Sequence, residues 1–165
     1  MDLLLSVFNQ RPHASVDPWW AALTVWVVVN AVNLLQAVGF LSRVRTGSFA
    51  LNHLLGYVMM VLAIPSMVAL VAFLRADAGW LHWVGPAVFL TFLALMIVVD
   101  YARPVEFRAP VRYDIVVPYL VLFFGAILLM GLPMFHMDRP LWLVTVATTT
   151  VLLASMGVAM RKGVG

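Results

Sequence analysis

Three side-chain amides recur one helical turn apart within an apolar stretch of the sequence, at Asn30, Asn33 and Gln36. Positions three residues apart drift slowly around one side of a helix, so these amides form a polar stripe. An amide in hydrocarbon is costly unless it finds a hydrogen-bonding partner. The stripe therefore predicts either hydrogen bonds to a neighbouring helix or a second copy of the chain, or a polar cavity for an uncharged solute or a lipid head group.

A proline lies near the middle of the next apolar stretch. Pro65 removes the hydrogen bond to the carbonyl of Val61 and predicts a kinked helix. In a membrane the released carbonyl must be satisfied in another way. Because Asn30 lies at a similar depth on the preceding antiparallel stretch, we expect the polar stripe to approach the Pro65 kink.

The segment 100–114 is the main polar cluster outside the apolar stretches. Its prolines forbid a continuous helix, and its charged residues alternate with apolar ones, so we expect it to lie along the membrane interface. Arg103, Arg108 and Arg112 have the planar guanidinium that matches phosphate and are candidate ligands for lipid head groups. The alternative is a salt-bridged loop that pins the two adjacent helices.

The same segment also supports a catalytic interpretation. Asp100, Glu106 and His53 are predicted on one side of the membrane, where they could form an acid/base set acting on lipid. No nucleophile, metalloprotease, phosphate-loop or dinucleotide motif is present, and the chain has no cysteine. We therefore predict no metal and no cofactor.

The composition defines the elements that must position these residues. Hydrophobic residues make up 64% of the 165 and charged residues 10%, which excludes a soluble fold of this size. A membrane-spanning helix needs about 20 apolar residues. Five uncharged stretches satisfy that length, and they lie at residues 19–41, 53–74, 80–99, 115–135 and 141–160. Short polar residues before the last four predict helix N-caps, at Asn52, Asp77, Asp114 and Asp138.

The predicted fold is an all-α, polytopic bundle of five transmembrane helices that forms a single domain over residues 1–165. Residues 1–18 are expected at the outer surface, where the sequence favours a short interfacial helix. All ten basic and all seven acidic residues fall outside the five spans, which disfavours ion-coupled chemistry within the bilayer.

Basic residues in the connecting segments predict the orientation. One side carries seven, which are Arg43, Arg45, Arg103, Arg108, Arg112, Arg161 and Lys162. The other side carries three, which are Arg11, Arg75 and Arg139. Short cytoplasmic loops are enriched in Lys and Arg, so the N-terminus is expected outside and the C-terminus in the cytoplasm of a cell (plasma) membrane protein.

Three classes of function remain open. The first is a non-catalytic membrane protein that binds a lipid or an apolar ligand, or that packs as a subunit of a membrane assembly. The second is an oligomeric channel or facilitator for a small uncharged solute, lined by Asn30, Asn33 and Gln36. The third is a lipid-acting enzyme that uses the 100–114 loop. The expected partners are membrane lipids, a second copy or another membrane protein, and nucleic acid is excluded because no soluble basic patch exists.

Overall fold

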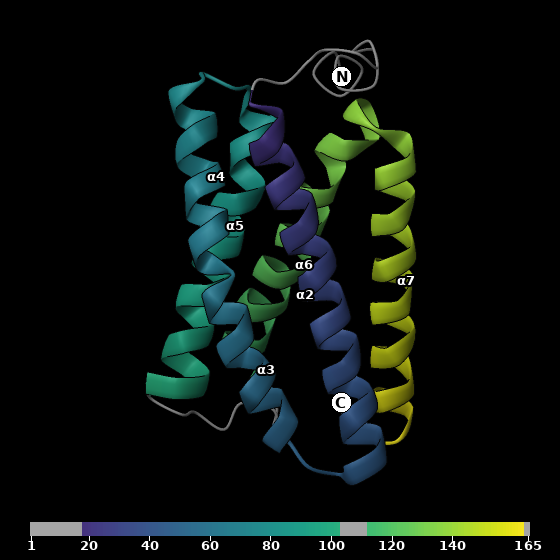
Figure 1. The fold of residues 1–165 in the computed structure, drawn as a ribbon. Coiled ribbons are helices and arrows are strands. Elements are labelled where there is room, and N and C mark those ends of the chain that lie inside the picture. The colour runs from purple at the N-terminus through teal and green to yellow at the C-terminus, as the bar shows by residue number, and fades with distance from the viewer. Residues whose placement is uncertain (1–17, 103–111, 164–165) are drawn as a thin grey trace.

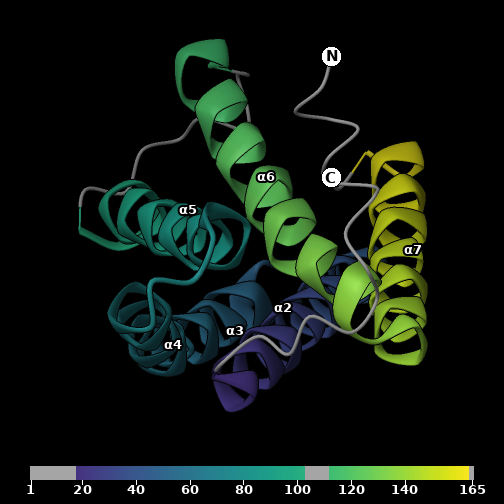
Figure 2. The same ribbon diagram turned by 90° about the horizontal axis from the view of Figure 1, so that it is seen from above.

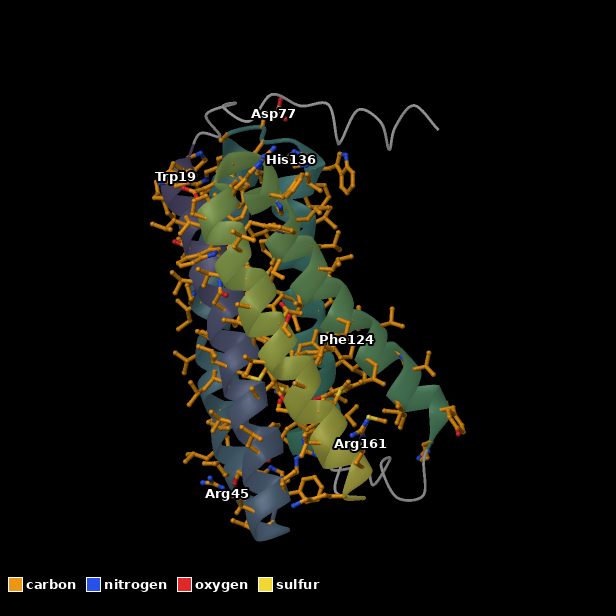
Figure 3. All side chains as sticks on the ribbon, turned by 90° about the vertical axis from the view of Figure 1, so that its right-hand side faces the viewer. Trp19, Arg45, Asp77, Phe124, His136 and Arg161 are labelled. Carbon is orange, nitrogen blue, oxygen red and sulfur yellow. The ribbon has the colours of Figure 1, made fainter. Side chains whose placement is uncertain are left out.

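The computed structural model describes residues 18–102 and 112–163, which are helical apart from short turns. Within these residues the elements are six α-helices and one π-helix, in the order α2 Trp19–Thr46, α3 Ala50–Val61, α4 Ala63–Arg75, α5 Trp80–Met96, η1 Ile97–Ala102, α6 Tyr113–Met137 and α7 Arg139–Arg161. They stand side by side as a bundle, with Trp19 and Arg161 at opposite ends (Figures 1 and 3).

In the part of the chain that the structure describes, five helical segments are long and apolar enough to cross a membrane. They are α2, α3 continued by α4, α5 continued by η1, α6 and α7, which confirms the predicted number of spans. Every span is at least as long as its prediction, because the helices continue beyond the uncharged stretches. The predicted outer-surface segment 1–18 lies, except for Pro18, outside the described residues.

The second span is interrupted near its proline, as the sequence predicts. A turn at Leu62 separates α3 from α4, three residues before Pro65. The Leu62 amide donates back to the Met59 carbonyl at 3.1 Å, and the Ser66 hydroxyl donates to the Leu62 carbonyl at 2.8 Å. The missing Pro65 donor thus leaves a short tight turn that is closed by local hydrogen bonds.

Only one of the four predicted N-caps forms. The Asp138 carboxylate accepts a hydrogen bond from the Leu141 amide at 3.0 Å, at the start of α7. The other three helices begin after Phe49, Gly79 and Arg112. The predictions at Asn52, Asp77 and Asp114 were therefore wrong. Asn52 instead lies within α3, because that helix begins three residues earlier than expected.

Helix α2 lies between α3 and α4 on one side and α7 on the other, and it contacts α3, α4, α6 and α7 (Figures 1 and 2). Its most extensive neighbour is α7, the last helix in the chain, and α5 packs most extensively on α6. The close approach of α5 and α6 depends on Gly85, where an added Cβ would lie 2.8 Å from the backbone of Leu129.

Candidate functional site: a cavity at the Arg43 end of the bundle

The amides of the predicted stripe lie at helix contacts. Asn30 Nδ2 donates to Thr145 Oγ1 at 3.2 Å, and the Thr148 hydroxyl donates to Asn30 Oδ1 at 2.7 Å. Asn33 Nδ2 donates to Thr148 Oγ1 at 3.1 Å and to Thr149 Oγ1 at 3.0 Å. These bonds join α2 to α7.

The third amide has a different partner. Gln36 Nε2 lies 2.9 Å from Met59 Sδ on α3. Asn30 takes its interhelical hydrogen bonds from α7, and the expected approach of the stripe to the Pro65 kink stays a prediction. The stripe is thus divided between α7 and α3.

A cavity of about 380 Å³ opens at the end of the bundle that carries Arg43. Its walls come from α2, α3, α5, η1, α6 and α7, so residues from nearly the whole chain meet there. The apolar wall is contributed mainly by α5, α6 and α7, through Phe92, Met96, Leu120, Phe123, Phe124 and Met156. Figure 3 places Phe124 at the fork where α6 and α7, close together near His136, diverge toward Arg161.

The polar part of the cavity is formed by side chains from four elements. They are Gln36 and Arg43 from α2, Asn52 and His53 from α3, Asp100 and Tyr101 from η1, and Tyr119 from α6. A half-enclosed space with an apolar wall and a few convergent polar groups is typical of a small-ligand site. Its volume lies within the range of about 300–1,000 Å³ common for such sites.

Arg43 is the buried cation among the described residues that line this cavity. Only 6% of the residue is exposed, and its guanidinium carbon lies 4.4 Å from the Phe40 ring centroid and 5.0 Å from that of Phe49. Aromatic faces attract a guanidinium and hold its plane, which limits the orientations of Arg43. The sequence prediction placed Arg43 in a connecting loop, whereas α2 continues to Thr46 and carries it onto the bundle interior.

The π-helix η1 brings Asp100 and Tyr101 to the cavity. Tyr119 Oη donates to Asp100 Oδ2 at 3.2 Å, and Tyr101 Oη donates to the His53 carbonyl at 2.9 Å. The Tyr101 hydroxyl occupies the position that a Cβ would take at Gly56. Short π-helical segments occur frequently at functional sites, where the changed register redirects side chains.

The structure does not bring the predicted site residues together in one site. Gln36 lines the cavity, whereas Asn30, Asn33 and Pro65 do not. Arg112 is exposed and forms an ion pair with Asp114 at 2.9 Å, away from the cavity lining. Arg103 and Arg108 lie outside the described residues.

The proposed acid/base set is only partly placed. His53 and Asp100 both line the cavity, and Glu106 lies outside the described residues. Sequence reasoning did not select Arg43, Asn52, Tyr101 or Tyr119 as site residues. Gly56 is the signal that could have indicated Tyr101, since a glycine within a span permits a close approach by another side chain.

The opposite end of the bundle carries histidines within an aromatic layer. The His82 ring centroid lies 5.7 Å from that of Phe73, and the His136 centroid lies 5.1 Å from that of Phe135. Within residues 18–102 and 112–163, no three side chains of the metal-binding types come together. These contacts are those of amphipathic rings at a membrane interface.

The fold and the cavity together fit a multi-pass membrane protein with a pocket at one end of its bundle. Comparisons with protein-family models, with curated proteins and with solved structures found no match to this chain.

Proposed function

We propose that this chain is a non-catalytic multi-pass membrane protein that binds a membrane lipid in the Arg43 cavity. The observation that carries the proposal is that one cavity combines an extended apolar wall with a buried guanidinium at the end of a membrane-spanning bundle. A membrane lipid has an apolar acyl chain and a polar head group. The acyl chain would match the apolar wall of the cavity, and the head group would match the guanidinium at the end of the bundle. Arginine matches phosphate geometry, which suits the head group.

The divergence of α6 and α7 supports lateral access from the bilayer. Both helices line the cavity, through Leu120 and Phe124 on α6 and through Met156 and Met160 on α7. An acyl chain lying between them would keep its length in hydrocarbon, so only the head group and the adjoining glycerol need to fit within about 380 Å³. The exposed apolar side chains along the outside of both helices are compatible with surrounding lipid.

The excess of basic residues at the cavity end supports an orientation with this end in the cytoplasm and Trp19 at the outer surface of the plasma membrane. The cavity would then take lipid from the cytoplasmic leaflet. Asn30 and Asn33 are bonded to α7, which supports a role of these amides in packing rather than in lining a solute channel.

The test is native mass spectrometry of the full chain released from a mild detergent. Leu120→Trp places a larger side chain in the cavity wall, whereas its neighbour Val121 is 64% exposed and absent from the lining, so Val121→Trp is the matched control. We expect bound lipid on the wild type and on Val121→Trp, and a loss of about tenfold for Leu120→Trp, equivalent to about 1.4 kcal/mol. Met156→Trp repeats the test from α7. Equal retention by all four proteins, or no lipid on the wild type, would overturn the proposal.

A second candidate, a lipid-acting enzyme, is favoured by one observation, which is that His53 and Asp100 line the same cavity. General acid/base chemistry needs such groups beside the substrate. The discriminating assay follows lipid composition by mass spectrometry after incubation of the purified chain with vesicles. New lipid products that disappear in His53→Ala would support this candidate, and an unchanged lipid composition would support binding without chemistry.

A further inference from the structure

Asn52 contributes a hydrogen-bond acceptor to the Arg43 cavity that the described part of the chain does not satisfy. It lies on α3 and lines the cavity, and its Oδ1 atom is buried with no hydrogen-bond partner among residues 18–102 and 112–163. Helix α3 begins after Phe49 without a side-chain cap, so the amide does not serve as an N-cap. A buried acceptor without a donor is costly, so an occupant of the cavity that supplies a donor would be favoured.

The neighbouring helix leaves room for this amide. An added Cβ at Gly39 on α2 would lie 2.9 Å from Asn52 Nδ2, so a glycine at that position lets the amide pack against α2. The last torsion of an asparagine side chain has broad preferences, so the amide can turn its oxygen toward an occupant of the cavity at small cost.

The two ends of the amide select ligands differently. Its N–H groups need an acceptor, and every phospholipid supplies acceptors in its phosphate and ester oxygens. Its oxygen needs a donor, and head groups differ in whether they carry one. A hydroxyl or a protonated amine donates, whereas a quaternary ammonium or an alkyl group does not. The oxygen of Asn52 can therefore distinguish lipids that its N–H groups cannot.

We infer, on the basis of the proposed lipid-binding function, that Asn52 makes the cavity select lipids whose head group carries a hydrogen-bond donor, either a hydroxyl or an N–H group. The donor bonds to Asn52 Oδ1 and takes the place of a protein partner. Because this acceptor is neutral, the selection holds between lipids of equal net charge, whether their head groups are zwitterionic or anionic.

The test uses two pairs of lipids whose members differ in a donor and not in net charge. Phosphatidyl-N,N-dimethylethanolamine has an ammonium N–H near neutral pH, where phosphatidylcholine has a methyl group. Phosphatidylglycerol has hydroxyls in its head group, and phosphatidylpropanol has none. Each pair, with identical acyl chains, is offered in equimolar amounts to the full chain delipidated in detergent, and native mass spectrometry measures the retained lipid. Charged groups around the cavity meet the same net charge in both members, so the ratio reports the hydrogen bond.

The wild type should retain the donor-bearing member of each pair over the other by about three- to tenfold, the effect expected of one hydrogen bond. Equal retention within the pairs, or preference for the members without a donor, would overturn the inference. A preference in only one pair would also overturn it, since a neutral acceptor serves both kinds of donor.

Variants at two positions assign the effect to Asn52. Asn52→Leu keeps a side chain of similar size and removes the acceptor, so both ratios should fall to about one. Asn52→Asp keeps oxygen acceptors at the same position and should keep both preferences. Gly39→Ala should lower both ratios, because the added methyl displaces the amide, whereas Gly157→Ala, with nothing within 4 Å of its Cβ, should leave them unchanged. Wild-type ratios in Asn52→Leu would contradict the assignment to this residue.

The outcomes also separate this inference from the proposed function. If the wild type retains none of the four lipids, the lipid-binding proposal itself fails. If the wild type retains lipid that Leu120→Trp loses, but without a preference within either pair, only the selection by Asn52 fails.

Discussion

The hydrogen bonds between Asn30 and α7 give the sharpest test of how this bundle is held together. Asn30→Leu keeps a side chain of similar size and removes both interhelical bonds, to Thr145 and to Thr148. Leucine gains little from burial here, because the unfolded reference state of a membrane helix is itself surrounded by hydrocarbon. The substitution therefore isolates the hydrogen bonds.

The magnitude follows from the number of bonds that cross the interface. Measured couplings of this kind in membrane proteins average about 0.6 kcal/mol and reach about 1.7 kcal/mol. Two crossing bonds predict that Asn30→Leu lowers the free energy of unfolding by about 1–3 kcal/mol. The two threonine hydroxyls keep a hydrogen-bond acceptor in Asn30→Leu. Thr148 Oγ1 lies 3.1 Å from the Thr145 carbonyl oxygen, and Thr145 Oγ1 lies 3.4 Å from the Leu141 carbonyl oxygen.

The assay is a double-mutant cycle with Thr148→Val, measured by reversible unfolding of the purified chain in mixed micelles. A coupling free energy of about 0.6–1.7 kcal/mol is expected between positions 30 and 148. Thr150 is the matched control, because this exposed threonine bonds only to the Val146 carbonyl of its own helix among the described residues. A coupling with Thr148 no larger than that with Thr150 would refute the reasoning, and so would stabilisation by Asn30→Leu.

Three further predictions rest on other parts of the fold. Gly85→Val should destabilise the bundle by about 1–3 kcal/mol, because the α6 backbone fills the space that the new side chain would need. The control is Gly157→Ala, where nothing lies within 4 Å of the added Cβ, so stability should stay unchanged or rise by up to about 1 kcal/mol. Equal effects of the two substitutions in a thermal unfolding assay would contradict the packing of α5 on α6. Gly56→Ala should reduce lipid retention in native mass spectrometry, because the added methyl displaces a tyrosine hydroxyl from the cavity lining; wild-type retention would contradict that arrangement. The chain has no cysteine, so Arg45→Cys and Asp77→Cys can each be labelled singly in right-side-out vesicles. The proposed orientation predicts that an impermeant maleimide reacts only at position 77. Reaction only at position 45 would show that the opposite orientation is correct.

The sequence by itself determined the features that depend on local chemistry. Each span needs about 20 uncharged residues because the hydrocarbon has a fixed thickness, so five such stretches predict five spans whatever their packing. The break near Pro65 follows from a donor that proline lacks, and the Asp138 cap follows from a short carboxylate placed just before a helix. None of these features requires knowledge of a distant part of the chain.

Tertiary structure alone decided which helices meet. The stripe of Asn30 and Asn33 was expected to approach the neighbouring span, yet its interhelical bonds go to α7, more than 100 residues away. Periodicity shows that a polar face needs partners but contains no information about which helix supplies them, because several spans carry groups at the same depth.

The cavity depends on tertiary structure for the same reason. Arg43 and Asp100 each lie just beyond an uncharged stretch, where a sequence places them in connecting loops. Helix α2 continues past Arg43 to Thr46, and the π-helical register of η1 redirects Asp100, so both residues line one cavity. Their convergence is a property of the packed bundle, since residues on separate helices become neighbours only when those helices adopt one arrangement in space.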